Sequence, residues 1–196
     1  TQVDLALING ALELSDQAAL KLGDDIRRVS GIDNPNSVAQ LKQWLSDQLG
    51  KDIDKLGKEA VNELLEAPQV KANPAVYYVL KKRKEMAKSS VKKYTAMENA
   101  VCKDGRVRGL LQFYGANRTG RWAGRLVQVQ NLPRNYIPEL SLARNLVKQE
   151  NAAMLELTYG SLPDTISQLI RTAFVPREGY EFVVADFSAI EARVIS

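Results

Sequence analysis

The sequence predicts an α+β fold, with a mostly helical first part and a second part in which helices accompany an incomplete antiparallel sheet. Up to about residue 101, apolar residues recur at the spacing of amphipathic helices. After Gly105, glycines and short apolar runs become frequent, as is typical of strands and loops. The run from Glu181 to Phe187 is almost continuously apolar, which indicates a strand buried on both faces. We therefore expect one part over residues 1–104 and another over 105–196.

Three helices are predicted before residue 70. Residues 3–22 have the pattern of an amphipathic helix, and a turn rich in Gly, Asn and Pro follows at 31–36. Ser37 can cap a second helix, and a short third helix ends near Pro68. The apolar residues spaced for one face of these helices are Leu5, Ile8, Leu12 and Ala19, then Val38, Leu41 and Leu45, and then Val61, Leu64 and Leu65.

One long basic helix is predicted from Pro74 to about Val101. A capping residue followed by proline, Asn73-Pro74, marks its start, and Lys103-Asp104-Gly105 forms a turn at its end. We expect this helix to pack on an apolar side and to offer ammonium groups on the other. The apolar stripe contains Tyr77, Leu80, Ala87, Val91, Tyr94 and Val101, and the lysines mostly off it are Lys81, Lys82, Lys84, Lys88, Lys92 and Lys93.

Shorter elements are predicted in the second part. The turn at Glu178-Gly179 is expected to precede the apolar strand over 181–187. In order before that turn, the pattern favours a strand over 106–113, a loop over 115–125, an extended or irregular segment over 126–132, a helix over 139–157 and a short helix from Ser161 through Ile170.

Composition excludes several classes of protein and site. The 196 residues are 45% hydrophobic and 26% charged, the ordinary mix of a globular protein. The longest uninterrupted apolar run has six residues, 75–80, which is too short to span a bilayer. A single cysteine, Cys102, excludes an intramolecular disulfide, and the absence of histidine excludes zinc sites of His and Cys and triads that need His. Any metal must therefore be a hard ion held by carboxylates.

Positive charge is concentrated in the middle of the chain. Residues 71–134 carry 15 basic and 3 acidic side chains, whereas the segments before and after have net charges of −5 and −3. Such a block favours a partner that carries phosphates. A solvated helix face would also explain Lys81-Lys82-Arg83-Lys84. A membrane surface is disfavoured, because the block lacks a broad apolar face with Trp or Phe anchors.

A carboxylate follows the predicted apolar strand. Asp186 comes directly after Val183-Val184-Ala185, and an aspartate at the exit of a buried strand is well held for metal binding. Aspartates in this position also start turns, and Ser188 with Glu191 three residues later has the spacing of a capping box. The spacing alone leaves the functional and the structural interpretation open.

Several ordered motifs resemble family A DNA polymerases, the DNA polymerase I-like enzymes. Residues 186–193, Asp-Phe-Ser-Ala-Ile-Glu-Ala-Arg, resemble motif A of that family. Thr119-Gly120-Arg121 followed by Gln130-Asn131-Leu132-Pro133 resembles the Thr-Gly-Arg and Gln-Asn-Ile-Pro segment, at a matching interval. Residues 170–176 are similar to the stretch that precedes motif A, and 115–125 resemble the phage and prophage branch. The resemblance is looser over 73–103 and weak over 1–72.

The resemblance implies a fold and a reaction. Residues 1–104 would be a helical region like the polymerase thumb, and 105–196 the first part of the palm. The reaction would be template-directed transfer of deoxynucleotides to a primer 3′ end, assisted by two Mg²⁺ ions. Its partners would be primer–template DNA, dNTPs and the remainder of a polymerase chain, without a membrane. The location would be the cytoplasm of a bacterial or phage-infected cell.

The resemblance also implies roles for single residues. Asp186 would be the catalytic metal ligand, assisted by the backbone carbonyl of Phe187. Glu191, with Ser188, would lie at the incoming nucleotide, where Glu191 leaves no room for a 2′-hydroxyl. The residues expected to contact DNA are Arg121 in the minor groove at the primer terminus, Gln130 and Asn131 along primer and template, Lys92 and Lys93 at phosphates, and Arg118 and Arg125 beside them.

Some features depart from the family pattern. Ala123 to Gln128 replace the usual Ser-Ser-Thr-Asp-Pro-Asn stretch, and residues 135–169 are longer than the link expected there. Motifs B and C do not occur, so we expect an excised piece that does not extend primers alone. The alternatives are a non-catalytic nucleic-acid-binding module, a helical protein-interaction domain and a relative of single-subunit RNA polymerases, against which Glu191 argues.

Overall fold

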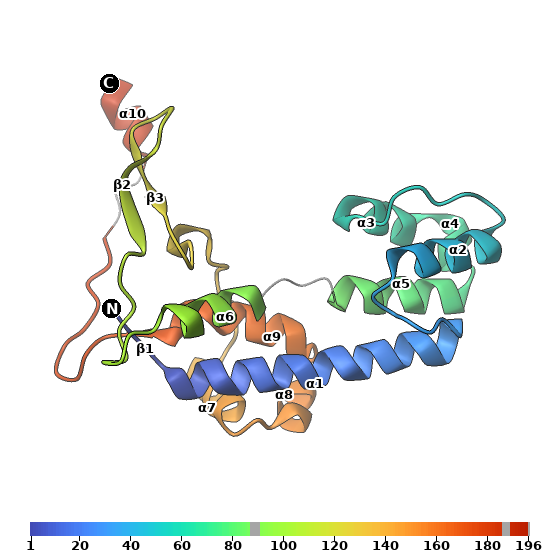
Figure 1. The fold of residues 1–196 in the computed structure, drawn as a ribbon, viewed down its shortest axis with the longest axis horizontal. Coiled ribbons are helices and arrows are strands. Elements are labelled where there is room, and N and C mark those ends of the chain that lie inside the picture. The colour runs from blue at the N-terminus through green and yellow to red at the C-terminus, as the bar shows by residue number, and fades with distance from the viewer. Residues whose placement is uncertain (87–90, 186–188, 196) are drawn as a thin grey trace.

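A long helix forms the axis of the molecule. The structure is a computed structural model that describes residues 1–86, 91–185 and 189–195. Helix α1 runs along the base of the elongated fold, with α6 to α9 around its first half and α2 to α5 around its far end (Figure 1). The helices are α1 Leu5–Ser30, α2 Val38–Leu49, α3 Lys58–Glu66, α4 Pro68–Lys71, α5 Pro74–Met86, α6 Val91–Ala100, α7 Leu140–Lys148, α8 Ala152–Tyr159, α9 Leu162–Leu169 and α10 Ile190–Ile195, with 3₁₀ turns η1 Val129–Asn131 and η2 Ile170–Ala173.

The predicted α+β class is confirmed. The strands described are β1 Gln2–Val3, β2 Leu111–Ala116, β3 Arg121–Gly124 and β4 Phe174–Val175. They form two separate antiparallel pairs, β1 with β4 and β2 with β3. No helix within the described ranges is long and apolar enough to cross a bilayer.

The first predicted helix is confirmed but is longer than expected. The Asp4 side chain accepts a hydrogen bond from the Leu7 amide and caps α1, and Gly31 ends the helix in the left-handed conformation with φ 71°. The predicted face is partly wrong, because Leu5 and Ala19 are exposed. The buried face includes Ala11 and Ala18, each one residue before the predicted Leu12 and Ala19. It consists of Leu7, Ile8, Gly10, Ala11, Leu14, Ala18, Leu22, Gly23 and Ile26.

The second and third predicted helices are also confirmed. Ser37 accepts a hydrogen bond from the Gln40 amide at the start of α2, as its position predicts. Leu41 and Leu45 are fully buried, and α3 ends at Glu66, just before Pro68.

Two hydrophobic cores share α1. The larger core joins the first half of α1 to α6, α7, α9 and η2, and the smaller core joins its last turns to α2, α3 and α5. The division into residues 1–104 and 105–196 stays a prediction, since the larger core includes residues from both parts. The smaller core consists of Ile26, Leu41, Leu45, Val61, Leu65, Val70, Val76, Val79 and Leu80.

The predicted long basic helix is described as two helices. Asn73 caps α5 by accepting from the Val76 amide at 3.2 Å, so the predicted start is confirmed. Helix α5 packs into the smaller core and α6 into the larger one, and residues 87–90 between them lie outside the described residues. The predicted stripe is wrong at Tyr77, which is exposed, because Val76 and Val79 face the core instead.

Three predicted elements of the second part differ from the structure. The strand predicted over 106–113 lies at 111–116, and the segment predicted as a loop over 115–125 contains the partner strand β3. The pairing of two strands stabilises this glycine-rich segment beyond its own weak propensity. The helix predicted over 139–157 is two helices, α7 and α8, with a break around Glu150, whose φ is 53°. The predictions of α9 and of the Glu178-Gly179 turn are confirmed.

The strand predicted over 181–187 is wrong for its described part. Residues 181–185 have no regular structure, and Val183 and Val184 are 87% and 90% exposed. A strand buried on both faces needs a hydrogen-bonded neighbour, and in the described part of the chain β2 pairs only with β3.

Helix α7 braces the start of α1. Gly10 lies so close to α7 that an added Cβ would stand 2.2 Å from the Val147 carbonyl oxygen. The Asp4 carboxylate accepts hydrogen bonds from Arg144 at 2.6 Å and is paired with Lys148 at 2.7 Å. Burial alone would raise the pKa of Asp4, but Lys148, the Leu7 amide and Arg144 outweigh burial and hold this pKa below its usual range. Helix α7, which lies within residues 135–169, therefore holds the start of α1.

Candidate nucleic-acid interface

The β2–β3 hairpin projects from the larger core, and three of the seven predicted contact residues lie in its turn, on β3 or directly after β3. In Figure 1 it rises from the end of the molecule opposite α2 to α5. Leu111 pairs with Gly124 and Gln112 with Ala123, and the register then shifts before Ala116 pairs with Arg121. Three residues of β2, 113–115, therefore lie opposite Trp122 alone. Such a bulge bends a hairpin and redirects its side chains.

The shape of the hairpin depends on its glycines. An added Cβ on Gly115 would stand 2.5 Å from the Ala123 Cβ, and one on Gly120 would stand 2.8 Å from the Tyr114 ring. Tyr114 itself has a φ of 52°, a conformation that costs a residue with a side chain about 1 kcal/mol. The glycines let the two strands and the Tyr114 ring approach closely, so the bulge is built into the sequence.

Arginines are concentrated in the segment that contains the hairpin. Between residues 105 and 134 the sequence has six arginines and no acidic residue. Arg118 lies in the turn, Arg121 begins β3 and Arg125 follows it, and all three are exposed. The structure thus brings these three predicted residues together. Arg108 forms a different contact at the foot of the hairpin, because its guanidinium pairs with Asp104 and lowers the pKa of that carboxyl.

Gln130 and Asn131 lie in the 3₁₀ turn η1, directly below β3. The side-chain amide of Gln130 rests on the backbone of Gly124, where an added Cβ would stand 2.0 Å from the Gln130 Oε1. Both residues are exposed. The backbone is left-handed at Leu126 and Gln128, each with a φ of 54°. This winding brings η1 back beside the strand, and so Gln130 joins the arginines on one structural unit.

The two predicted lysines of α6 differ in their surroundings. Lys92 is exposed. The Lys93 ammonium donates a hydrogen bond to the Val127 carbonyl oxygen at 2.6 Å and is partly buried. Lys93 therefore joins α6 to the segment between β3 and η1, while contact with a phosphate stays a prediction for both lysines.

The motif that begins at Asp186 is described only in part. Asp186, Phe187 and Ser188 lie outside the described residues, and Glu191 belongs to the backbone of α10. Helix α10 begins at Ile190, and Val194 is 78% exposed on it. Within the ranges that the structure describes, no group of three or more Asp, Glu or Cys side chains could hold a metal ion.

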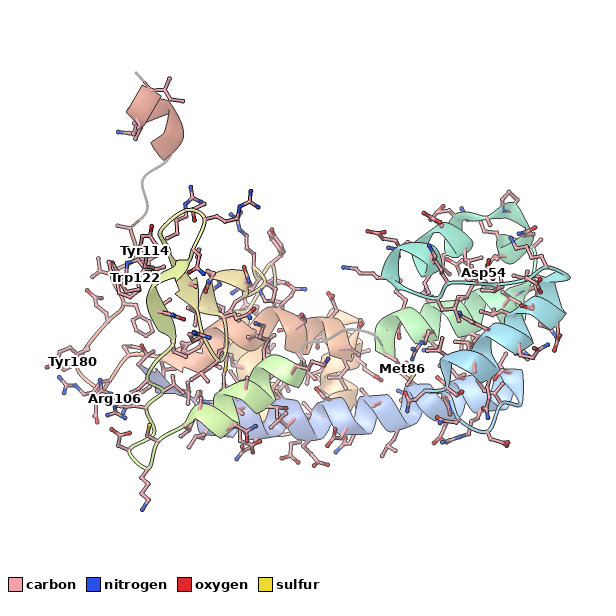
Figure 2. The ribbon with its side chains drawn as sticks, turned by 45° about the horizontal axis from the view of Figure 1, so that its top comes forward. Asp54, Met86, Arg106, Tyr114, Trp122 and Tyr180 are labelled. Carbon is pink, nitrogen blue, oxygen red and sulfur yellow. The ribbon has the colours of Figure 1, made fainter. Side chains whose placement is uncertain are left out.

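Aromatic side chains of the hairpin were missed by the sequence reasoning. Phe113 and Trp122 are 71% and 59% exposed, and their ring centroids are 5.2 Å apart in an edge-to-face arrangement. Tyr114 is 57% exposed, with its ring 6.4 Å from that of Phe113. Figure 2 shows Tyr114 and Trp122 on the hairpin, away from the helices. The signal in the sequence was aromatic residues interleaved with arginines between 113 and 125.

An apolar groove of about 740 Å³ lies at the foot of the hairpin. Leu111 and Leu132 line it together with Phe182 and Val184 of the exposed extended segment. Arg171 also lines the groove and donates a hydrogen bond to the Leu132 carbonyl at 2.9 Å. The residues after β4 thus run beside the hairpin toward α10, as Figure 1 shows.

Comparison with known proteins places these residues in a family. The sequence profile of DNA polymerase family A matches residues 10–196. The chain is 54% identical over 195 residues to a protein named DNA polymerase from Bacillus phage SP02. That alignment covers 100% of the chain and 30% of the phage protein. No solved structure matches the chain significantly.

Proposed function

The chain belongs to DNA polymerase family A, and we propose that it holds primer–template DNA for a template-directed DNA polymerase. The observation that carries this proposal is the family match across residues 10–196 together with the arginine-rich hairpin inside the matched range. The sequence over 105–134 has six arginines and no acidic residue, and the exposed Arg118, Arg121 and Arg125 suit a ligand that presents phosphates along its length.

The proposed contacts follow from the positions of the side chains. Arg121 starts β3 on the exposed hairpin and would reach the minor groove, where every base pair offers an acceptor at a similar place. Gln130 and Asn131 on η1 would contact the neighbouring nucleotides. Arg118 and Arg125 would hold phosphates on either side, giving a grip that does not depend on sequence.

Asp186 is the proposed catalytic carboxylate, with the Phe187 carbonyl beside it. Carboxylate and carbonyl oxygens are the ligands that Mg²⁺ prefers, so these two groups fit that ion. Bound Mg²⁺ would neutralise charge on the reacting phosphates. Glu191 and Ser188 would lie against the incoming dNTP. Motifs B and C do not occur in the sequence, so we propose that the chain alone binds DNA without extending a primer.

We also propose that residues 1–104 act as the thumb and 105–196 as the first part of the palm. The smaller core at the far end of α1 is separate from the larger one, which supports the proposal that this end acts as a thumb along a duplex. The remainder of a polymerase chain would be the partner that supplies the other catalytic groups, since the chain spans 30% of its phage relative.

Binding to a primer–template duplex across a salt series tests the proposed DNA contacts of the hairpin and η1, called the DNA grip below. The logarithm of the affinity should fall linearly with the logarithm of the salt concentration, with a slope of about −0.9 per phosphate contacted. Arg121→Gln should weaken binding and reduce that slope by about 1. Lys51→Gln removes the same charge from the exposed loop between α2 and α3, at the other end of the molecule, and should leave the slope unchanged. Equal effects of both substitutions would contradict a specific role for the hairpin.

Primer extension tests the catalytic proposal. The chain alone with Mg²⁺ should bind but not extend a primer, and robust extension would contradict this. A chimera in which the chain replaces its matching segment of the Bacillus phage SP02 protein should extend primers. The same chimera with Asp186→Asn should keep duplex binding and lose extension. Retained extension would remove Asp186 from the catalytic role.

A further inference from the structure

Two aromatic rings on the hairpin form an exposed pair that the larger core does not cover. Phe113 lies on β2 within the bulge and Trp122 lies opposite it on β3. Their rings meet edge to face with centroids 5.2 Å apart and planes inclined by 68°, yet they keep 71% and 59% of their surface exposed. This geometry fixes the two rings against each other while ring surface remains open to a ligand.

The local backbone supports this display of rings. The bulge places three residues of β2 opposite Trp122, and Tyr114 within it has a φ of 52°. The Tyr114 ring leans over Gly120, which turns it toward the tip of the hairpin. Bulges and strained conformations of this kind cluster at binding sites, because a regular hairpin would not aim the side chains in this way.

The charge around the rings indicates what kind of molecule they would meet. Arg121 is the immediate neighbour of Trp122, and Arg118 and Arg125 flank the same strand. A hairpin that carries both exposed aromatic rings and exposed arginines matches a ligand in which flat bases alternate with phosphates. Proteins that bind single strands combine these two features, with bases stacked on aromatic rings and a cationic surface along the backbone.

We propose that Phe113 and Trp122 form a stacking platform for unpaired bases of a DNA strand, with the neighbouring arginines holding its phosphates. Bases inside a duplex have their faces covered by their neighbours, so only an unpaired base can stack on these rings. The proposal rests on the proposed DNA binding for its class of ligand. It adds that the hairpin distinguishes single-stranded from paired DNA through its rings, independently of the contacts made by Arg121 in a groove.

Trp122 offers a direct signal for this contact. The chain has two tryptophans, and Trp44 is partly buried against the smaller core, at the far end of α1. In a Trp44→Phe background, emission comes from Trp122 alone. An oligothymidylate of about ten nucleotides should quench this emission as it binds. A strand of equal length without bases has the same phosphates and should bind more weakly without quenching.

Substitution of the other ring completes the test. Phe113→Ala should lower the affinity for oligothymidylate by about 5- to 150-fold, the equivalent of one stacked base. Phe113→Leu keeps an apolar side chain but has no ring face, so it should show the same loss. A Phe113→Leu protein that binds as tightly as wild type would show that the loss in Phe113→Ala came from disturbed folding and would overturn the platform. Tyr136→Ala removes a ring that is 79% exposed outside the hairpin and should leave binding unchanged.

The outcomes separate this proposal from the proposed function. Equal affinity for the strands with and without bases, with unchanged Trp122 emission, would overturn the stacking platform. Duplex binding in the salt series would then still support the DNA grip. If the chain does not bind duplex DNA but oligothymidylate still quenches the Trp122 emission, the proposed function would be contradicted and the stacking platform would stand. Equal losses in Phe113→Ala and Tyr136→Ala would also overturn the platform.

Discussion

Two glycines inside α1 have opposite surroundings, and this contrast gives a sharp test of how the helix is held. Replacing either glycine by alanine gains about 1 kcal/mol of helix propensity. At Gly23 the added Cβ would lie 3.7 Å from Pro35, in ordinary contact. At Gly10 it would lie 2.2 Å from the Val147 carbonyl oxygen and 3.0 Å from the carbonyl carbon. These are backbone atoms of α7 and cannot rotate away.

The cost of Gly10→Ala follows from the distance between the added Cβ and the Val147 carbonyl oxygen. Ordinary contact begins near 3.4 Å, so α7 would have to move by roughly 1 Å to admit the methyl group. Helix α7 carries Ala143, Leu146 and Val147 in the larger core, and its displacement would loosen their packing. Overpacking of this kind costs about 1–3 kcal/mol or more. After the gain in helix propensity, we expect Gly10→Ala to lower the free energy of unfolding by up to about 2 kcal/mol, and Gly23→Ala to raise it by up to about 1 kcal/mol.

Urea unfolding followed by far-ultraviolet circular dichroism measures this difference. The two variants share one helix and one chemical change, so propensity cancels between them. A Gly10→Ala protein as stable as Gly23→Ala would refute the close approach of α1 and α7. A change in the slope with urea would indicate an altered denatured or native state instead of a simple loss of packing.

Two further predictions concern the brace of α1 and the surface of η1. Asp4→Asn keeps a side chain that caps α1 but leaves the two cations of α7 without their anion, and it should cost about 2 kcal/mol near pH 7. Because the folded-state pKa of Asp4 is lowered, its contribution is present above about pH 4 and is lost as the pH falls through the folded pKa, so thermal unfolding of wild type and variant should converge in acid. Gly124→Ala should displace the Gln130 side chain from the Gly124 backbone with little loss of stability. It should weaken duplex binding as much as Gln130→Ala does, by about fivefold in an anisotropy titration. An effect of Gly124→Ala without one of Gln130→Ala would contradict that placement.

Local signals in the sequence located the helix starts well. Ser37 and Asn73-Pro74 act within three residues of themselves, so the hydrogen bonds that they make can be read without knowing the fold. The faces of the helices were harder to assign. Helix α1 packs on two cores, and its buried Gly10 lies against α7, which follows more than a hundred residues later.

Strands were predicted less well, because pairing decides them. The segment before Arg121 contains glycines and has a weak intrinsic preference, but β2 and β3 stabilise each other across the turn. The run before Asp186 has a strong preference for a strand and has no described partner, so Val183 and Val184 remain exposed. Intrinsic propensity fails in opposite directions in these two segments for the same physical reason.

Some residues of the candidate site could be predicted from local motifs, whereas others depend on how the backbone folds. Arg118, Arg121, Arg125 and Gln130 came from motifs, and the structure gathers them on the hairpin and η1. Phe113 and Trp122 were missed, because Phe113 lies outside those motifs and Trp122 lies within 115–125 without a role assigned to it. The proximity of the two rings arises from the bulge. Sequence reasoning found the charges that a polyanion requires, whereas the arrangement of rings depends on backbone geometry.

Residues 135–169, which the motifs left unassigned, hold the start of α1. They form α7 to α9, and α7 holds Asp4 through Arg144 and Lys148. The residues beside Asp4 also join distant segments, since the Val3 amide donates to the Gly105 carbonyl and the Asp4 amide to the Ala173 carbonyl. One of these carbonyls precedes the hairpin and the other precedes the segment that leads to Asp186. The contacts of α7 with the start of α1 therefore support both the base of the proposed DNA-binding hairpin and the approach to the proposed catalytic residue Asp186, and loosening α7 should disturb both.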